Sequence, residues 1–186
     1  GASSGYRIRI TGAVCGRKDR SDAAFSITPV PDLFYFPSGL QFCAGEQGVV
    51  IPVYGRNSQA IKGYGVNLCF DPAVFECVDV VREGTRGEGG SEFVKLCEPG
   101  CARGGLIYSA ACPPQIESGD GIVLKLVVNV KPDAATGATS LDLNNAGPGY
   151  STMTLCSGAS FDPVLWDGTV QICAAASSST GSRGEE

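Results

Sequence analysis

The sequence contains no histidine, and this absence removes several kinds of active site at once. Without an imidazole the chain cannot form Ser-His or Cys-His nucleophile pairs or the commonest zinc sites.

The sequence also has no run of about 18 apolar residues, and no positively charged segment followed by an apolar one marks an export signal. We therefore expect no membrane insertion. The chain begins at Gly1 without methionine, which suggests a segment of a longer polypeptide.

Basic residues are few, and the formal net charge is −5. The local cluster of Arg17, Lys18 and Arg20 is too small to follow a phosphate backbone, so nucleic acid is not an expected partner. A carboxylate pair could still hydrolyse glycosides. The acidic residues in question lie mostly in turns, where Asp bonds to the backbone; they are Glu46, Asp71, Asp120, Asp133, Asp162 and Asp167. We expect no catalysis and no cofactor.

Long helices are also missing from the pattern. No segment keeps an apolar stripe at i, i+3, i+4 and i+7 over three helical turns, so no helix beyond one or two turns is expected. Instead, 26 glycines and 11 prolines punctuate short runs of valine, isoleucine and leucine. This pattern is typical of short strands joined by turns. The predicted class is all-β, and 186 residues have room for one full core.

Cysteine is abundant, with nine residues, but no Cys-x-x-Cys pair or histidine completes a zinc site. Disulfides formed outside the cytoplasm account for the cysteines better, which indicates an extracellular or cell-surface protein. The odd count leaves one thiol free or bonded to another chain. No metal is expected, because Asp142, Asn144 and Asn145 lack the Asp/Asn/Gly spacing of a calcium loop.

Four segments are expected along the chain. Two short alternating stretches, 6–11 and 24–27, predict a β-hairpin, and such a hairpin is marginal in water unless it packs elsewhere. The Ser/Gly-rich end has nothing to bury and should be flexible. The segments are an N-terminal hairpin (1–28), a connector (29–38), a main domain (39–174) and a linker (175–186).

The main domain shows nine candidate strands separated by turn signals, which favours a sandwich or a barrel. The predicted strands are 40–44, 48–55, 61–70, 74–82, 93–96, 105–111, 121–130, 139–143 and 167–173. The third of them must stop before Asp71-Pro72, because this dipeptide forms turns and cannot continue a central ladder.

Four ordered segments of the main domain resemble a cohesin domain. Residues 40–54, which end Val-Ile-Pro-Val-Tyr, are similar to the opening hairpin of that family, and residues 63–78, with Phe-Asp-Pro-Ala-Val, look like its aromatic-Asp-Pro run. Residues 119–143 resemble its Asp-Gly-Val-Leu strand and the strand after it, and residues 165–172, Leu-Trp-Asp-Gly-Thr-Val-Gln-Ile, its closing strand. Residues 1–28 look like the last strands of an immunoglobulin- or fibronectin-like repeat. The resemblance implies a nine-stranded jelly-roll sandwich, an architecture shared with some carbohydrate-binding modules.

The resemblance also implies a non-catalytic scaffolding module that binds a dockerin-like domain or another surface protein on one flat sheet face. Alternation in the strand at 61–70 sends Tyr64 and its i+2 neighbours inward, so that glycines stand where cohesins place polar side chains and Asn67 offers the polar group. The expected binding-face residues are Gly63, Gly65, Asn67, Cys69, Ile107, Ser109 and Cys112.

Disulfide pairing follows from the same resemblance. The first and last strands are neighbours in that family, which makes Cys43 with Cys173 the best single pair. Cys69 with Cys112 is a second hypothesis across the binding face. Cys97 and Cys101 complete the candidates, and the connectivity among these last four stays open.

Two other functions remain open. Residues 1–28 could add strands to a neighbouring subunit and so assemble a surface filament, with the odd cysteine linking subunits. Alternatively, the sandwich binds polysaccharide, which usually needs a row of exposed aromatic rings. The candidate rings are Trp166 and Tyr150, with contributions from Tyr35, Tyr54 and Tyr64. No single strand of the main domain carries an alternate-residue aromatic pair.

Overall fold

The computed structural model of the chain describes residues 3–6, 9–11, 18–20, 25–27, 30–144 and 151–175. Its regular elements are all strands, which confirms the predicted all-β class. Within this part of the chain there is no helix long and apolar enough to cross a bilayer. The chain divides into two units, Gly1–Pro31 and Asp32–Glu186, and the second holds the main domain.

The described residues of the N-terminal unit form two strand pairs, where the sequence predicts a single hairpin. β1 (Ser3–Tyr6) pairs antiparallel with β4 (Phe25–Ile27), and β2 (Arg9–Thr11) pairs antiparallel with β3 (Lys18–Arg20). The stretch 6–11, expected as one strand, contributes Tyr6 to β1 and residues 9–11 to β2.

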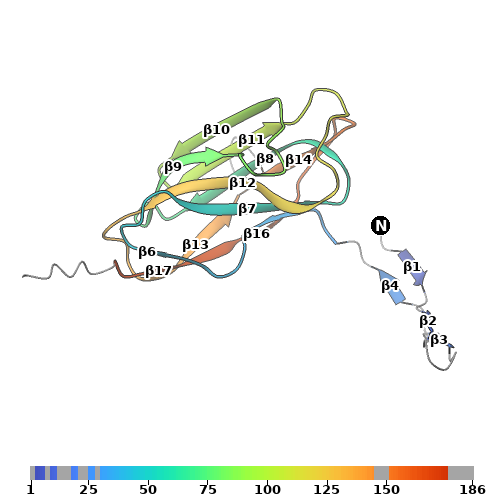
Figure 1. Cartoon of the computed structure of the whole chain (residues 1–186), viewed down its shortest axis with the longest axis horizontal. Coiled ribbons are helices and arrows are strands. Elements are labelled where there is room, and N and C mark those ends of the chain that lie inside the picture. The colour runs from blue at the N-terminus through green and yellow to red at the C-terminus, as the bar shows by residue number, and fades with distance from the viewer. Residues whose placement is uncertain are drawn as a thin grey trace, which may run out of the picture. The chain divides into compact units, whose positions relative to one another are not determined.

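The second unit is a sandwich of two sheets (Figure 1). The larger sheet has eight strands, of which six follow the order β10-β11-β8-β13-β17-β6. β14 pairs with the first part of β8, beyond the end of β13, and β15 pairs with β14. The bounds are β6 (Leu40–Cys43), β8 (Ile61–Phe70), β10 (Glu92–Glu98), β11 (Cys101–Ile107), β13 (Gly137–Leu143), β14 (Thr152–Leu155), β15 (Ser160–Phe161) and β17 (Gly168–Cys173).

The smaller sheet has five strands in the order β16-β5-β7-β12-β9. Its strands pair antiparallel, except that β16 runs parallel to β5. The larger sheet likewise contains one parallel pair, β17 with β6. The bounds are β5 (Leu33–Tyr35), β7 (Val49–Asn57), β9 (Phe75–Val81), β12 (Gly119–Val130) and β16 (Val164–Trp166).

Each of the nine predicted strands has a counterpart in the sandwich, but the count is wrong, because the two sheets hold thirteen strands among the described residues. The additional strands β5, β14, β15 and β16 have two to four residues each, too few to show an alternating pattern. β5 lies in the stretch expected to be a connector. β11 also starts and ends earlier than the predicted 105–111, and Cys112-Pro113-Pro114 follows outside the ladder, where proline has no N–H to donate.

The turn at Asp71-Pro72 ends β8 at Phe70, as its sequence predicts. The Asp71 carboxylate accepts a hydrogen bond from the Ala73 N–H at 2.8 Å, and its carbonyl accepts from the N–H groups of Val74 and Phe75, both at 3.0 Å. The side chain and the carbonyl of Asp71 together thus satisfy three backbone donors that follow the end of the ladder.

The core lies between the two sheets and contains alternate residues of the long strands. On β12 a register shift between Ile122 and Leu124 turns both Val123 and Leu124 inward, at 2% and 0% exposure. The opposite layer approaches closely at this point, since a Cβ on Gly104 of β11 would lie 2.2 Å from Cδ1 of Leu124. A glycine is therefore required there by packing.

One side of the sandwich is closed where both sheets end in edge strands. Cys77 of β9 and Cys97 of β10 form a disulfide between the two sheets. Beside it the Lys95 ammonium lies 2.6 Å from the Asp79 carboxylate, and this hydrogen bond lowers the pKa of Asp79 below its ordinary value. These links hold the two edges together.

Candidate functional site

Glycines meet on the outer face of the eight-stranded sheet. In the register of β8 and β11, Gly65 lies opposite Gly105, and Gly63 lies opposite Ile107. Their strand neighbours Tyr64 and Leu106 are buried, at 3% and 2% exposure, so the alternation places the glycines on the outer side. The outer face therefore presents bare backbone over two adjacent strands.

These glycines form the floor of a groove of about 950 Å³, which we call the glycine groove. One wall comes from β10, with Glu92 and Val94, and the other from β14 and the β15 region, with Thr152, Thr154, Ser160 and Asp162. The register explains the walls, because Val94 lies beside Gly105 while Thr152 lies beside Gly65. Side chains of β10 and β14 thus flank a floor in which the glycines of β8 and β11 have no side chains.

On the β10 side of the groove, exposed apolar side chains lie beside Glu92. Val94 is 72% exposed and Ile107 48%, and Leu96, next to Val94 on the same face of β10, is 42% exposed. Contiguous exposed apolar surface on a soluble domain commonly marks a binding site. Val94 and Ile107 form the apolar wall of the glycine groove, and Leu96 extends this exposed apolar surface along β10.

Gly63 of β8 and Gly105 of β11 differ in whether the surrounding structure requires a glycine. A Cβ added to Gly63 would lie 2.5 Å from the Leu106 carbonyl oxygen, so the close approach of the strands demands glycine there. At Gly105 the nearest heavy atom to an added Cβ is the Tyr64 carbonyl oxygen, at 4.0 Å. Packing would therefore allow a side chain at Gly105. The absence of one keeps the groove open.

Tyr64 supports the floor from behind. Its hydroxyl donates a hydrogen bond to the Val123 carbonyl across the core, and burial raises the pKa of Tyr64 above its ordinary value. The ring makes an edge contact with Phe34 at a centroid distance of 6.3 Å. Tyr64 is therefore a core residue, and its expected contribution to an exposed aromatic row is wrong.

The groove includes part of the predicted binding face. Gly63, Gly65, Ile107 and Ser109 line it. Asn67 does not face outward to a partner: it is 2% exposed, because Ser151 covers it and exchanges hydrogen bonds with its backbone N–H and carbonyl, at 3.1 and 3.3 Å. β14 and the residues before it were not predicted, so this cover was not visible in the alternation of β8.

The other two predicted face residues, Cys69 and Cys112, are in disulfides but not with each other. Cys69 is bonded to Cys101, its direct partner in the register of β8 and β11. Cys112 is bonded to Cys156, which ties the segment after β11 to the end of β14. The hypothesised bridge of Cys69 with Cys112 is therefore wrong, since the earlier start of β11 brings Cys101 opposite Cys69.

The remaining cysteines complete the pairing. Cys43 and Cys173 are bonded, as direct neighbours on the parallel strands β6 and β17. Cys97 pairs with Cys77 rather than with a residue of its own sheet. The ninth cysteine, Cys15, lies outside the described residues, as do Tyr150 and Asn145.

Side chains that could bind a metal are dispersed over the domain. In the part of the chain that the structure describes, no three Cys, Asp or Glu side chains gather closely enough to hold a metal ion. Asp142 is exposed on β13, opposite Cys69. Asp167 accepts a hydrogen bond from the Leu143 N–H at 2.8 Å, a role in joining strands.

Comparison with known proteins identifies the architecture. No protein-family model and no curated protein matches the sequence. Among solved structures, the OlpA cohesin from a Clostridium thermocellum cohesin–dockerin complex matches with a TM-score of 0.65 and 15% identity, over 77% of this chain and 100% of that one. The sixth cohesin of Acetivibrio cellulolyticus scaffoldin B, solved with a Cel5 dockerin, gives 0.65 and 17%, over 77% and 100%. A non-cellulosomal cohesin from the archaeon Archaeoglobus fulgidus gives 0.60 and 19%, over 77% and 92%. The second unit therefore has the cohesin fold.

Proposed function

We propose that this chain is a non-catalytic protein-binding module that receives a dockerin-like domain in the glycine groove. The observation that carries the proposal is the open groove itself, with a floor of backbone and an exposed apolar wall of Val94 and Ile107. The fold supports it, because several solved structures with the same fold are cohesins in complex with dockerins.

The chemistry of the groove defines the partner further. Because Gly63, Gly65 and Gly105 carry no side chains, a partner element can approach the sheet more closely than over ordinary strands. The apolar wall fits aliphatic side chains, and the Thr/Ser wall offers hydroxyl groups to polar ones. A helix with an apolar ridge beside a polar row meets both requirements.

A non-catalytic role and an extracellular setting are parts of the same proposal. The chain has no histidine to serve as a general base near neutral pH, and the groove is lined mainly by glycine, valine, isoleucine, threonine and serine. Four disulfides within one small domain are typical of proteins outside the cytoplasm.

The binding test uses the calcium-loaded dockerins of the Clostridium thermocellum and Acetivibrio cellulolyticus complexes as probes, with affinity measured by titration calorimetry. We expect at least one of them to bind the full chain. Gly105→Leu should weaken that binding about tenfold or more, because its side chain fills the groove without displacing core atoms. Thermal unfolding should stay close to that of the wild type.

A pair of matched variants separates a local effect from a general one. Val94→Asp places a charge on the apolar wall and should also reduce affinity about tenfold. Val78→Asp makes the same change on β9 of the other sheet, where the valine is 50% exposed, and should leave the affinity unchanged. Absence of binding by every dockerin, or equal loss in both aspartate variants, would contradict the proposed partner or its site.

A further inference from the structure

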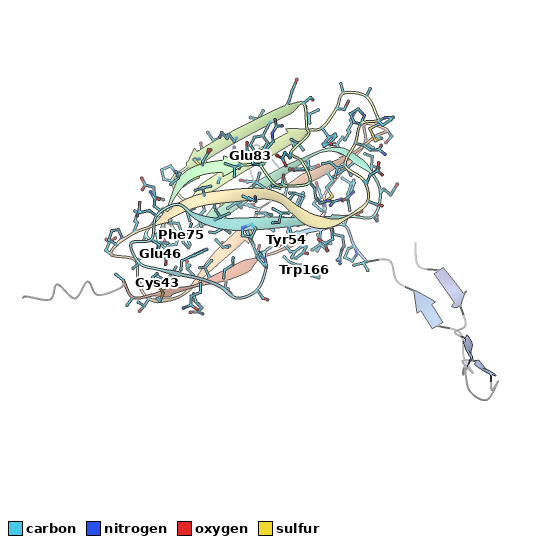
Figure 2. The ribbon with its side chains drawn as sticks, viewed as in Figure 1. Cys43, Glu46, Tyr54, Phe75, Glu83 and Trp166 are labelled. Atoms are coloured by element: carbon cyan, nitrogen blue, oxygen red, sulfur yellow. A yellow bond between two sulfur atoms is a disulfide. The ribbon has the colours of Figure 1, made fainter. Side chains whose placement is uncertain are left out.

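Three aromatic side chains come together on the five-stranded sheet, on the face of the sandwich opposite the glycine groove. Trp166 of β16 is the register partner of Tyr35 of β5, and Tyr35 is the register partner of Tyr54 of β7. Ring centroids lie 6.4 Å apart for Trp166 and Tyr35 and 5.3 Å apart for Tyr35 and Tyr54. Figure 2 labels Tyr54 and Trp166, which lie near each other on the sandwich. We call these three residues the aromatic row.

The row is accessible and its members do not belong to the core. Trp166 is 54% exposed, and both tyrosines are partly exposed. A large exposed indole costs free energy in water unless a ligand covers it. The chain neighbours of these residues anchor their strands in the core. Leu165, next to Trp166, packs against the core, and Phe34, next to Tyr35, is fully buried. The rings thus project from strands that the core anchors.

Polar groups flank the rings. The Tyr35 hydroxyl donates a hydrogen bond to the Asp120 carboxylate at 2.9 Å. Burial and this hydrogen bond raise the pKa of Tyr35, and the bond directs the hydroxyl toward Asp120. Asp120 is the register partner of Arg56 on β7, so opposite charges lie side by side next to the aromatic row. The surroundings combine hydrogen-bonding groups with little net charge.

From this arrangement we infer that the aromatic row is a binding site for a neutral polysaccharide. Pyranose rings have apolar C–H faces that pack on aromatic side chains and hydroxyl edges that need hydrogen-bond partners. Trp166, Tyr35 and Tyr54 supply the aromatic surface for the C–H faces. Asp120 supplies a hydrogen-bond acceptor for the sugar hydroxyl groups. The balanced charges of Asp120 and Arg56 give an acidic glycan no advantage.

Chains of β-1,4-linked pyranoses fit the row best. Their equatorial linkages keep successive sugar rings extended, so that one chain can contact side chains on several neighbouring strands. The row crosses three strands, which are about 4.8 Å apart in a sheet. The Trp166 ring is inclined by 64° to that of Tyr35, so the two rings offer differently oriented faces to successive sugar units. The site leaves the glycine groove free for a protein partner.

The test is a depletion isotherm of the full chain on microcrystalline cellulose and on chitin, two neutral β-1,4-linked polysaccharides. We expect the wild type to bind at least one of them. Trp166→Ala should weaken that binding about tenfold or more, whereas Trp166→Phe should retain a larger part because it keeps a ring. The matched control is Val164→Ala, an exposed residue of the same strand, which should bind as the wild type does.

Several outcomes would overturn the inference. These are no binding to either polysaccharide, or binding that Trp166→Ala leaves unchanged while its unfolding temperature matches the wild type. A second copy of the chain is the competing occupant. If size-exclusion chromatography shows a concentration-dependent dimer that Trp166→Ala abolishes, the aromatic row is a self-association surface and the polysaccharide assignment fails.

Discussion

Replacing Cys43 and Cys173 together by alanine is expected to lower the free energy of unfolding by about 5 kcal/mol. The disulfide joins β6 to β17 over a sequence separation of 130 residues, so it removes a large loop-closure entropy from the unfolded chain. Denaturant unfolding of the oxidised wild type and of the double variant measures the difference directly. Such a loss is a large fraction of the total stability of a typical domain.

The control for loop length is the pair Cys77 and Cys97, which spans only 20 residues. Their double alanine variant should lose about 3 kcal/mol, because a shorter loop costs the unfolded chain less entropy. A larger loss for this pair than for the pair of Cys43 and Cys173 would mean that contacts in the folded state, rather than loop closure, determine the contribution of each disulfide.

The second large effect is expected at Arg86, where Arg86→Ala should lower the free energy of unfolding by about 2 to 4 kcal/mol. The guanidinium donates hydrogen bonds to the carbonyl oxygens of Gly55 and Gly119, at 3.0 and 3.1 Å, to the Asn57 side-chain oxygen at 2.7 Å and to the Glu117 carbonyl. Removing it takes a hydrogen bond from each of these acceptors where β7 and β12 meet, and of the four the Glu117 carbonyl keeps a bond from the Asn57 side-chain amide, at 3.0 Å. Chemical denaturation measures the loss.

Arg103→Ala is the matched control for that variant. Arg103 is partly exposed and makes one long ion pair, at 3.7 Å, with the exposed Glu98, so its removal should cost less than about 1 kcal/mol. Arg86→Lys should fall between the two, because an ammonium keeps the charge but cannot reach the same set of carbonyls. Equal effects at Arg86 and Arg103 would refute the special role of the Arg86 guanidinium.

The binding groove was only partly predictable from the sequence. Alternation in β8 placed Gly63 and Gly65 outward, and both lie in the floor of the groove. The opposite glycine, Gly105, was missed, because the strand was expected to begin there rather than at Cys101. The wall formed by β14 and β15 was missed as well, since strands of two to four residues carry no measurable period.

The aromatic row shows a similar limit. Aromatic residues two positions apart on one strand would be visible in the sequence, whereas the row runs across three strands through residues at 35, 54 and 166. Two of those strands, β5 and β16, have only three residues each and were not predicted. Cross-strand neighbours depend on register, which sequence spacing does not contain.

The absence of helical periodicity, the short apolar runs and the turn signals determined the all-β class and nine of the strands, because local backbone preferences and burial leave a record in consecutive residues. The missing histidine and the abundant cysteines likewise restricted the chemistry through composition alone. Tertiary structure alone decided that Cys101 rather than Cys112 faces Cys69, that Ser151 covers Asn67, and that three distant aromatic rings are neighbours. These features depend on pairing between strands far apart in the chain, where a shift of one residue exchanges the buried and exposed faces.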